Sequence, residues 1–137
     1  MMVDRIYSRM ALDVLEASMR LHRKRHKFIS ANIANADTPN YKAVRFSFER
    51  DLQRVVYGGD ELPLYTTHPE HIQVVPEGLE DVKGRVSRVW RPKRNDENTV
   101  DIDREMARLS ENQLMYETLV QAYSQQIARL KYAITGR

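Results

Sequence analysis

The 137-residue chain contains no cysteine, which excludes a disulfide framework and any chemistry that depends on a thiol. No apolar run approaches the roughly 18 residues that a membrane-spanning helix needs. Hydrophobic residues make up 42% of the chain and charged residues 30%, so the material for a buried core is limited. Met1 to Arg20 interleaves charged with apolar residues, and we therefore expect no cleaved secretory signal.

Glycine and proline are scarce, with five of each, and they are distributed unevenly. All except Pro39 and Gly136 fall between Gly58 and Pro92. Because both residue types interrupt helices, two long helices are expected at the two ends of the chain. The expected segments are an N-terminal helix (1–36), a turn and post-helix segment (37–54), an irregular middle with short strands (55–99) and a C-terminal helix (100–137).

Turn-forming residues dominate the middle of the chain, and we expect a small hairpin or irregular arm there. The candidate strands are Leu64–Thr67, Ile72–Val75 and Arg85–Trp90. The C-terminal helix that follows could be capped by Asn98 or Thr99. Asp101, Asp103 and Glu105 would then place negative surface charge in its first turn, where the helix dipole favours it.

Both expected helices carry an apolar stripe, here called a seam, whose members alternate three and four residues apart. The C-terminal seam has one polar member and consists of Ile102, Met106, Leu109, Gln113, Tyr116, Val120, Tyr123, Ile127, Leu130 and Ile134. The N-terminal seam contains two histidines and consists of Leu12, Leu15, Met19, His22, His26, Ile29 and Ile33. Such spacing is typical of coiled coils. The expected fold is mainly α, with the two terminal helices packed as an antiparallel coiled-coil hairpin and a small irregular or β-containing middle.

Two helices alone cannot enclose all of this apolar surface. Leu114, Met115 and Leu119 lie outside the C-terminal seam, and the histidines weaken the N-terminal one. We therefore expect the isolated monomer to have mobile termini that become ordered when like or homologous subunits surround them. Gln113 could set the register of such packing by bonding to a polar group on an adjacent helix.

The chain must turn directly after the N-terminal helix. Asn35 can satisfy groups left open at the helix end, and Pro39 disfavours a helical conformation at Thr38. Asn40 then stands where a turn that begins with proline can require a positive φ, which asparagine tolerates better than most residues.

This stretch resembles the signature of the bacterial flagellar axial proteins, which form the rod, the hook and the hook–filament junction. The matching residues are Asn32, Ala34, Asn35, Thr38, Pro39, Tyr41 and Lys42. Asn40 stands where the family usually has glycine. The short length, the segments Asn112–Tyr116 and Leu130–Ile134 and the phrase Thr66–Ile72 are most similar to the subunits of the proximal rod.

The resemblance implies a structural subunit of the proximal rod of the flagellar basal body, which assembles through its terminal helices into the hollow shaft that transmits torque. Implied partners are other rod subunits in a homo- and hetero-oligomer, the adaptor between the rod and the inner-membrane ring, and the flagellar type III export gate. The implied location is the rod in the periplasmic space, reached without a cleaved signal peptide. Phe48 and Leu52 resemble the short element that engages the export gate, although both could equally be packing residues.

Arg20, Arg23, Lys24, Arg25 and Lys27 form a basic run, whereas the net charge of the whole chain is only +3. The run leaves open an alternative function as a basic helical protein that binds nucleic acid. A cytoplasmic coiled-coil adaptor is also left open. No aromatic stacking residues interleave with the run, which favours salt bridges to neighbouring subunits and no nucleic-acid partner.

No pattern of residues points to catalysis, a metal or a cofactor. His22 and His26 lie four residues apart, as do ligand pairs on helices, but no third ligand completes the spacing. The sequence also lacks a nucleophile elbow and a phosphate-binding glycine loop. We therefore expect neither an enzyme nor a metalloprotein.

Overall fold

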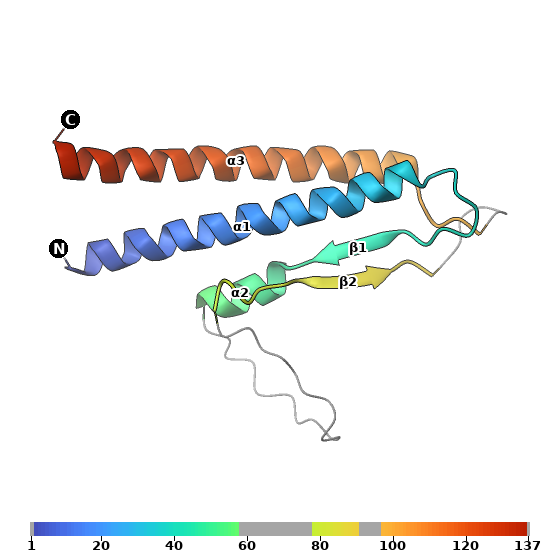
Figure 1. Ribbon diagram of the computed structural model, residues 1–137, viewed down its shortest axis with the longest axis horizontal. Helices are drawn as coiled ribbons and strands as arrows, with labels where there is room; N and C mark the ends of the chain where they lie inside the picture. The colour runs from blue at the N-terminus through green and yellow to red at the C-terminus, as the bar shows by residue number, and fades with distance from the viewer. Residues whose placement is uncertain (1, 58–77, 91–96, 137) are drawn as a thin grey trace, which may run out of the picture.

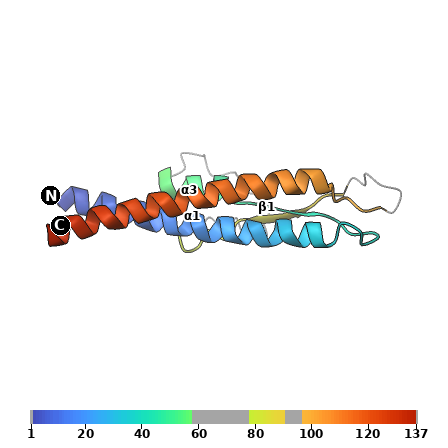
Figure 2. The same ribbon diagram turned by 90° about the horizontal axis from the view of Figure 1, so that it is seen from above.

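The computed structural model describes residues 2–57, 78–90 and 97–136 and contains two long helices that lie side by side (Figure 1). Helix α1 spans Met2–Ala34 and helix α3 spans Ile102–Thr135. They run antiparallel, so the two chain ends lie at the same end of the molecule in both views (Figures 1 and 2). The expectation of a mainly helical chain with paired terminal helices and a small β-containing middle is confirmed.

Capping residues fix both ends of α3. Asp101 is the N-cap, and its side chain accepts a hydrogen bond from the Arg104 N–H at 3.3 Å. The assignment of this cap to Asn98 or Thr99 is wrong, because both are buried and bond to other segments. Gly136 closes the helix with a φ of 68°, and its N–H donates to the Tyr132 carbonyl at 2.8 Å.

A short antiparallel ribbon and a third helix occupy the other side of α1 (Figure 1). Strand β1 (Val44–Ser47) pairs with β2 (Arg85–Arg88), with Phe46 opposite Val86. Helix α2 (Glu49–Tyr57) follows β1 directly. Regular structure therefore occupies part of the segment that was expected to be turn and post-helix chain, and β2 falls inside the expected strand Arg85–Trp90. The other two candidate strands lie outside the described residues.

The larger of two buried apolar clusters lies between α1 and this ribbon. Leu21, Phe46, Phe48 and Val82 form its centre, and the rings of Phe28 and Phe46 stack with centroids 5.4 Å apart. Gly84, with a φ of 67°, lies so close to the cluster that an added Cβ would be 2.4 Å from Phe46. Only glycine fits this approach, since any other residue would meet both the ring and an unfavourable backbone conformation.

The smaller cluster lies where the helices meet the turn that follows α1. It contains Ala36, Ala43 and Val100, with Tyr41 and Val89 packed against it. The apolar core is thus concentrated on the ribbon side of α1 and at one end of the helix pair. α1 contacts both α3 and β1, so it is the element that connects the layers.

Candidate assembly site: the helix junction and the seams

Asn32 is the buried centre of the junction at the end of α1. Its Nδ2 donates to the Val44 carbonyl at 2.8 Å and to Glu105 Oε2 at 2.9 Å. Its Oδ1 accepts hydrogen bonds from the Val44 N–H at 2.8 Å and from the Tyr41 hydroxyl at 3.3 Å. All four hydrogen-bonding positions of the amide are used, so one fully buried side chain joins α1, β1 and α3.

Glu105 is the partner of Asn32 on α3 and is only 3% exposed. Arg108, one turn later, donates to its other carboxylate oxygen at 2.6 Å. A carboxylate is costly to bury unless it is paired and hydrogen-bonded, and Glu105 meets both conditions. The expectation that Glu105 is a surface charge of the first helical turn is therefore wrong.

The turn after α1 has the conformation expected from its residues. Asn40 has a φ of 61°, in the left-handed region. Asn35 donates from its side chain to the Ala31 carbonyl at 2.8 Å and accepts from the Thr38 hydroxyl at 3.3 Å. Lys42 then donates to the Glu97 carbonyl at 2.7 Å, which connects the turn to the segment leading into α3. Pro39 and Ala34 are exposed.

Asn98 and Thr99 hold this turn from the opposite side, a role that the sequence did not reveal. The Asn98 amide, which is fully buried, donates to the carbonyls of Asn35, Ala36 and Thr38 at 2.8–3.1 Å. Thr99 accepts from the Ala43 N–H at 2.7 Å through its hydroxyl. The Asn98 amide thus satisfies carbonyls of the turn that follows α1, and Thr99 satisfies the N–H of Ala43 just beyond it.

The C-terminal seam is divided between two faces of α3. Leu109, Tyr116, Tyr123 and Leu130 are half-buried, and they share a helix face with the polar residues Glu105 and Asn112 that contact α1. The remaining members lie on the flank of that face and are exposed: Ile102, Met106, Gln113, Val120, Ile127 and Ile134. The residues that face α1 keep the expected three-and-four spacing but in a different phase, since Asn112, Leu119 and Gln126 occupy the alternate places.

The N-terminal seam lies largely on one side of α1. Ile29 is buried, and Leu12, Leu15, Met19 and Ile33 are half-buried. His22 is half-buried as well, whereas His26 is exposed.

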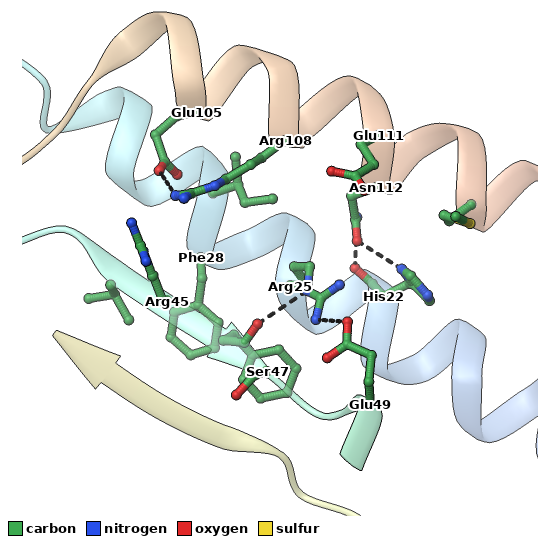
Figure 3. A pocket seen from close by; sticks show the side chains of 14 residues that line it. His22, Arg25, Phe28, Arg45, Ser47, Glu49, Glu105, Arg108, Glu111 and Asn112 are labelled. Atoms are coloured by element: carbon green, nitrogen blue, oxygen red, sulfur yellow. Dashed lines mark hydrogen bonds and ion pairs between the residues drawn. The ribbon is translucent and has the colours of Figure 1, made fainter. Parts of the chain in front are cut away.

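A reciprocal polar pair connects the middle of the two helices (Figure 3). His22 Nδ1 and Asn112 Oδ1 lie 2.8 Å apart, and Asn112 Nδ2 donates to the His22 carbonyl at 3.0 Å. Within one copy Gln113 donates to Glu117 of its own helix, and its expected contact with an adjacent helix of the assembly stays a prediction. Asn112 is therefore the register-setting residue within the chain, and its neighbour in the sequence is not.

The basic run lies on α1, and three of its side chains bond to the segments on the ribbon side of the molecule. Arg20 donates to the carbonyls of Leu79 and Glu80 at 2.8 and 3.3 Å, and Lys24 donates to the Lys83 carbonyl at 3.0 Å. Arg25 donates to the Phe46 carbonyl at 3.2 Å, as Figure 3 shows. Three of the five cations thus have intramolecular partners, while Arg23 and Lys27 are exposed.

Arg25 also forms an ion pair with Glu49 at the start of α2 (Figure 3). Burial by itself would raise the pKa of Glu49. Hydrogen bonds from the Phe48 N–H and from Arg25 outweigh this effect, so the pKa lies below its ordinary value of 4.5.

Phe48 and Leu52 lie in the apolar core of the folded chain. Phe48 is only 3% exposed. Its ring and the His22 ring are nearly perpendicular, with centroids 5.0 Å apart, and Arg25 Cζ lies over the Phe48 ring, 4.4 Å from its centroid. Leu52 packs against the same cluster. Phe48 and Leu52 were interpreted either as an export-gate element or as packing residues. In the folded chain they are packing residues.

A groove of about 480 Å³ runs between α3 and β1, with α1 as its floor (Figure 3). Charged side chains of both signs border it, among them Arg45, Arg108 and Glu111. Over residues 2–57, 78–90 and 97–136 no three His, Cys, Asp or Glu side chains form a group that could hold a metal ion. No helix in the same ranges is long and apolar enough to cross a membrane.

Comparison with known proteins points to one family. The family model described as flagella basal body rod protein matches residues 12–42, from the middle of α1 to the end of the junction turn. Among curated relatives, the flagellar basal body rod protein FlgB of Salmonella typhimurium is 32% identical over 98% of this chain and 99% of its own. FlgB of Aquifex aeolicus is 36% identical over 83% and 84%. FlgB of Buchnera aphidicola is 30% identical over 88% and 91%.

Proposed function

Because this chain belongs to the FlgB family of flagellar basal body rod proteins and is a structural rod subunit, we propose that it builds the proximal rod, the drive shaft that transmits torque. The observation that carries this proposal is the exposed apolar flank of α3. Ile102, Met106, Val120 and Ile127 are 39–48% exposed and Ile134 is 83% exposed, although they share one side of a helix. Exposed apolar stripes of this kind mark surfaces that other proteins cover.

The seam residues supply the helix packing of the assembled shaft. Within one copy the half-buried members, such as Leu109 and Leu130, pair α1 with α3, while the exposed members face like and homologous subunits. The partners we propose are other rod subunits, the adaptor that joins the rod to the inner-membrane ring, and the flagellar type III export gate. The chain works in the periplasmic space, is exported without a cleaved signal peptide, and acts by packing and not by catalysis.

Nothing favours the alternatives of a nucleic-acid-binding protein or a cytoplasmic adaptor. Three residues of the basic run are engaged with backbone carbonyls of the same chain, which leaves little of the run for a phosphate backbone.

The test of the shaft function is complementation in a flagellated strain that lacks its own copy of this protein. The chain should restore basal bodies and swimming. Leu109→Asp and Leu130→Asp should abolish incorporation while the protein is still made, because a charge in the seam prevents dry helix packing. Normal swimming with both variants would contradict the role of the seam.

The ordering of the termini during assembly has a separate test. The isolated monomer should have less helix by circular dichroism than the assembled state, because neighbours cover seam surface that one copy leaves exposed. Equal helix content in dilute monomer and in assembly would refute this.

Phe48 and Leu52 would act in export before the chain folds, since both are packed in the folded core. The test compares Phe48→Ala with Leu21→Ala, because both remove a large apolar side chain from the same cluster. Loss of secretion in the first variant alone supports an export element. Equal secretion of the two variants would restrict Phe48 to packing.

A further inference from the structure

The two outer edges of the β1–β2 ribbon differ in what bonds to their backbone. In the described chain the ribbon has two strands, so each strand has one partner and one outer edge. On β1 the outer edge is covered by α1. Asn32 bonds to both the N–H and the carbonyl of Val44, and Arg25 donates to the Phe46 carbonyl. Val44 and Phe46 therefore direct their backbone toward α1 and away from β2.

The outer edge of β2 has no such cover. Arg88 lies opposite Val44, and Val86 lies opposite Phe46. In an antiparallel pair, two opposite residues either bond to each other or both point their backbone outward. The N–H and carbonyl groups of Val86 and Arg88 therefore point away from β1, and within the described chain no hydrogen bond reaches them. Figure 1 shows that β2 lies on the side of β1 away from the long helices.

The side chains along this edge are exposed as well. All four residues of β2 are exposed, and Trp90, just beyond the strand, is 72% exposed. Val86, Arg88 and Trp90 share one face, because side chains two positions apart point the same way in an extended chain. Val86 is 55% exposed, and among the described residues Arg88 forms no ion pair. An open edge beside exposed apolar side chains is a surface on which another strand can pair.

The chemistry of this edge indicates an acidic polypeptide as its occupant. Val86 and Arg88 each offer one N–H donor and one carbonyl acceptor, which matches a polypeptide backbone, whereas a phosphate backbone offers acceptors only. Residues 83–94 contain six basic residues and no acidic one. A second copy of β2 would meet this edge with charge of the same sign, which is unfavourable between paired strands. The occupant should therefore be extended and negatively charged.

One stretch of this chain has a matching sequence. Residues 58–77, which lie outside the described structure, contain four acidic residues and no lysine or arginine. Glu70 and Ile72 are two positions apart, as are Arg88 and Val86. An antiparallel strand that sets Glu70 opposite Arg88 would also set Ile72 opposite Val86, so opposite charges would meet and apolar side chains would meet.

The segment that enters β2 favours a second copy over the same copy as the source of this stretch. Arg20 donates to the carbonyls of Leu79 and Glu80, and Lys24 donates to the Lys83 carbonyl. The chain is thus bonded to α1 just before β2 begins, whereas the open edge of β2 faces away from α1. A neighbouring copy is free of this constraint.

We propose that the open edge of β2 binds residues 68–72 of a second copy as an added antiparallel strand. Glu70 and Ile72 would supply its backbone hydrogen bonds, and Pro69 stands at an alternate position, where the added strand needs no N–H. Each copy then gives a strand to one neighbour and receives one from another. Contacts of this kind that do not close into a ring extend into an open helical array. The inference deepens the proposed shaft function and rests on it, since it names a contact between successive copies.

The first experiment uses Trp90, the single tryptophan of the chain, as a reporter of the edge. A synthetic peptide with the sequence of residues 58–77 is titrated into the purified chain. Tryptophan emission should shift to shorter wavelength as the peptide covers the ring. Arg88→Glu should weaken peptide binding about fivefold, because an attractive cross-strand pair becomes repulsive, and a Glu70→Lys peptide should restore it.

The matched control is Lys131→Glu, at an exposed position of α3. This variant should bind the unaltered peptide as the natural chain does. No emission shift, or equal binding of the unaltered and Glu70→Lys peptides to the natural chain, would overturn the proposal.

The second experiment uses the absence of native cysteine. A Glu70→Cys copy and an Arg88→Cys copy are expressed together in a flagellated strain, and the assembled basal bodies are oxidised. Directly opposite residues on paired strands have Cβ atoms about 4.5–5.5 Å apart, close to the reach of a disulfide. A disulfide should therefore join the two variants. Ser87→Cys is the control for Arg88→Cys and should not form this bond, because its side chain points to the other face of β2.

The outcomes separate the two levels of inference. Failure of the unaltered chain to restore basal bodies would contradict the shaft function. Restored basal bodies in which the two cysteine copies are not joined would leave the shaft function intact and overturn the strand contact. A disulfide that forms only within single chains of the double variant would assign the stretch to its own β2 and overturn the proposal. An emission shift with duplex DNA and none with the peptide would assign the edge to a polyanion and overturn it as well.

Discussion

The two ends of the helix pair are held together in different ways. At the junction end, Asn32, Asn98 and Glu105 are buried and make directional hydrogen bonds to three other segments. Toward the other end, no hydrogen bond joins α1 to α3 in the described chain beyond the His22–Asn112 pair, and apolar side chains such as Leu15 and Leu119 are only half-buried. The junction defines the geometry of one copy, while the opposite end depends on apolar packing that is only partly buried.

Removing the central amide of the junction should have the largest effect on stability. Asn32→Leu leaves the Val44 N–H and carbonyl and the Glu105 carboxylate without their buried partner. Losses of this kind cost about 3–5 kcal/mol in the free energy of unfolding. Urea denaturation of the purified chain measures it, with Ser30→Leu at an exposed position of the same helix as the control. A loss below about 1 kcal/mol would mean that the junction is not the more rigid end.

The His22–Asn112 pair marks the boundary between the two ends, and its effect should be intermediate. A double-mutant cycle with His22→Ala and Asn112→Ala should give a coupling energy of about 1 kcal/mol, since contacting residues are not additive. The same cycle on Gln113 and His22 should give none, because Gln113 bonds within its own helix. Equal coupling energies in the two cycles would show that Asn112 does not set the register of α1 against α3.

Charges placed on the exposed flank should hardly affect the isolated chain. Val120→Asp and Ile127→Asp change side chains that are 39% and 42% exposed, so the free energy of unfolding should shift by no more than about 0.5 kcal/mol. Incorporation into basal bodies should nevertheless be lost if, as we propose, neighbouring subunits cover this flank. Swimming at the normal rate with both variants would show that this flank faces solvent in the assembly.

The smallest effect concerns pH and the Arg25–Glu49 pair. The pKa of Glu49 is lowered in the folded chain, so its contribution to stability is present above the ordinary value of 4.5 and is lost as the pH falls through the folded pKa. The stability difference between the natural chain and Glu49→Gln should therefore shrink on acidification below pH 4.5. A difference that is constant from pH 7 to pH 3 would contradict the pairing.

Local signals in the sequence were sufficient for the long helices and the turn. The lack of glycine and proline in both terminal stretches predicts the helices, and Asn40 adopts the left-handed conformation that its position suggested. Strand β1 was missed because it has only four residues and its partner lies about 40 positions away in the sequence. Pairing over such a distance leaves no local pattern.

The phase of the α3 seam could not be read from hydrophobicity for a related reason. Glu105 and Asn112 are polar, so a search for apolar residues passes over them, yet both are buried against α1. Their burial depends on Asn32 and His22, which come from a distant segment. A buried polar residue is visible in a sequence only when its partner is known.

The fully used amide of Asn32 has a consequence for how copies enter an assembly. If α3 slipped along α1, the Glu105 carboxylate and the Asn32 amide would be left unsatisfied away from water, and such a copy would lie several kcal/mol, about 3–5, above the correct one. Misaligned molecules would therefore be rare before any neighbour is met. The junction therefore favours one alignment of α1 and α3 within each chain. The copies that enter an assembly should then share one conformation.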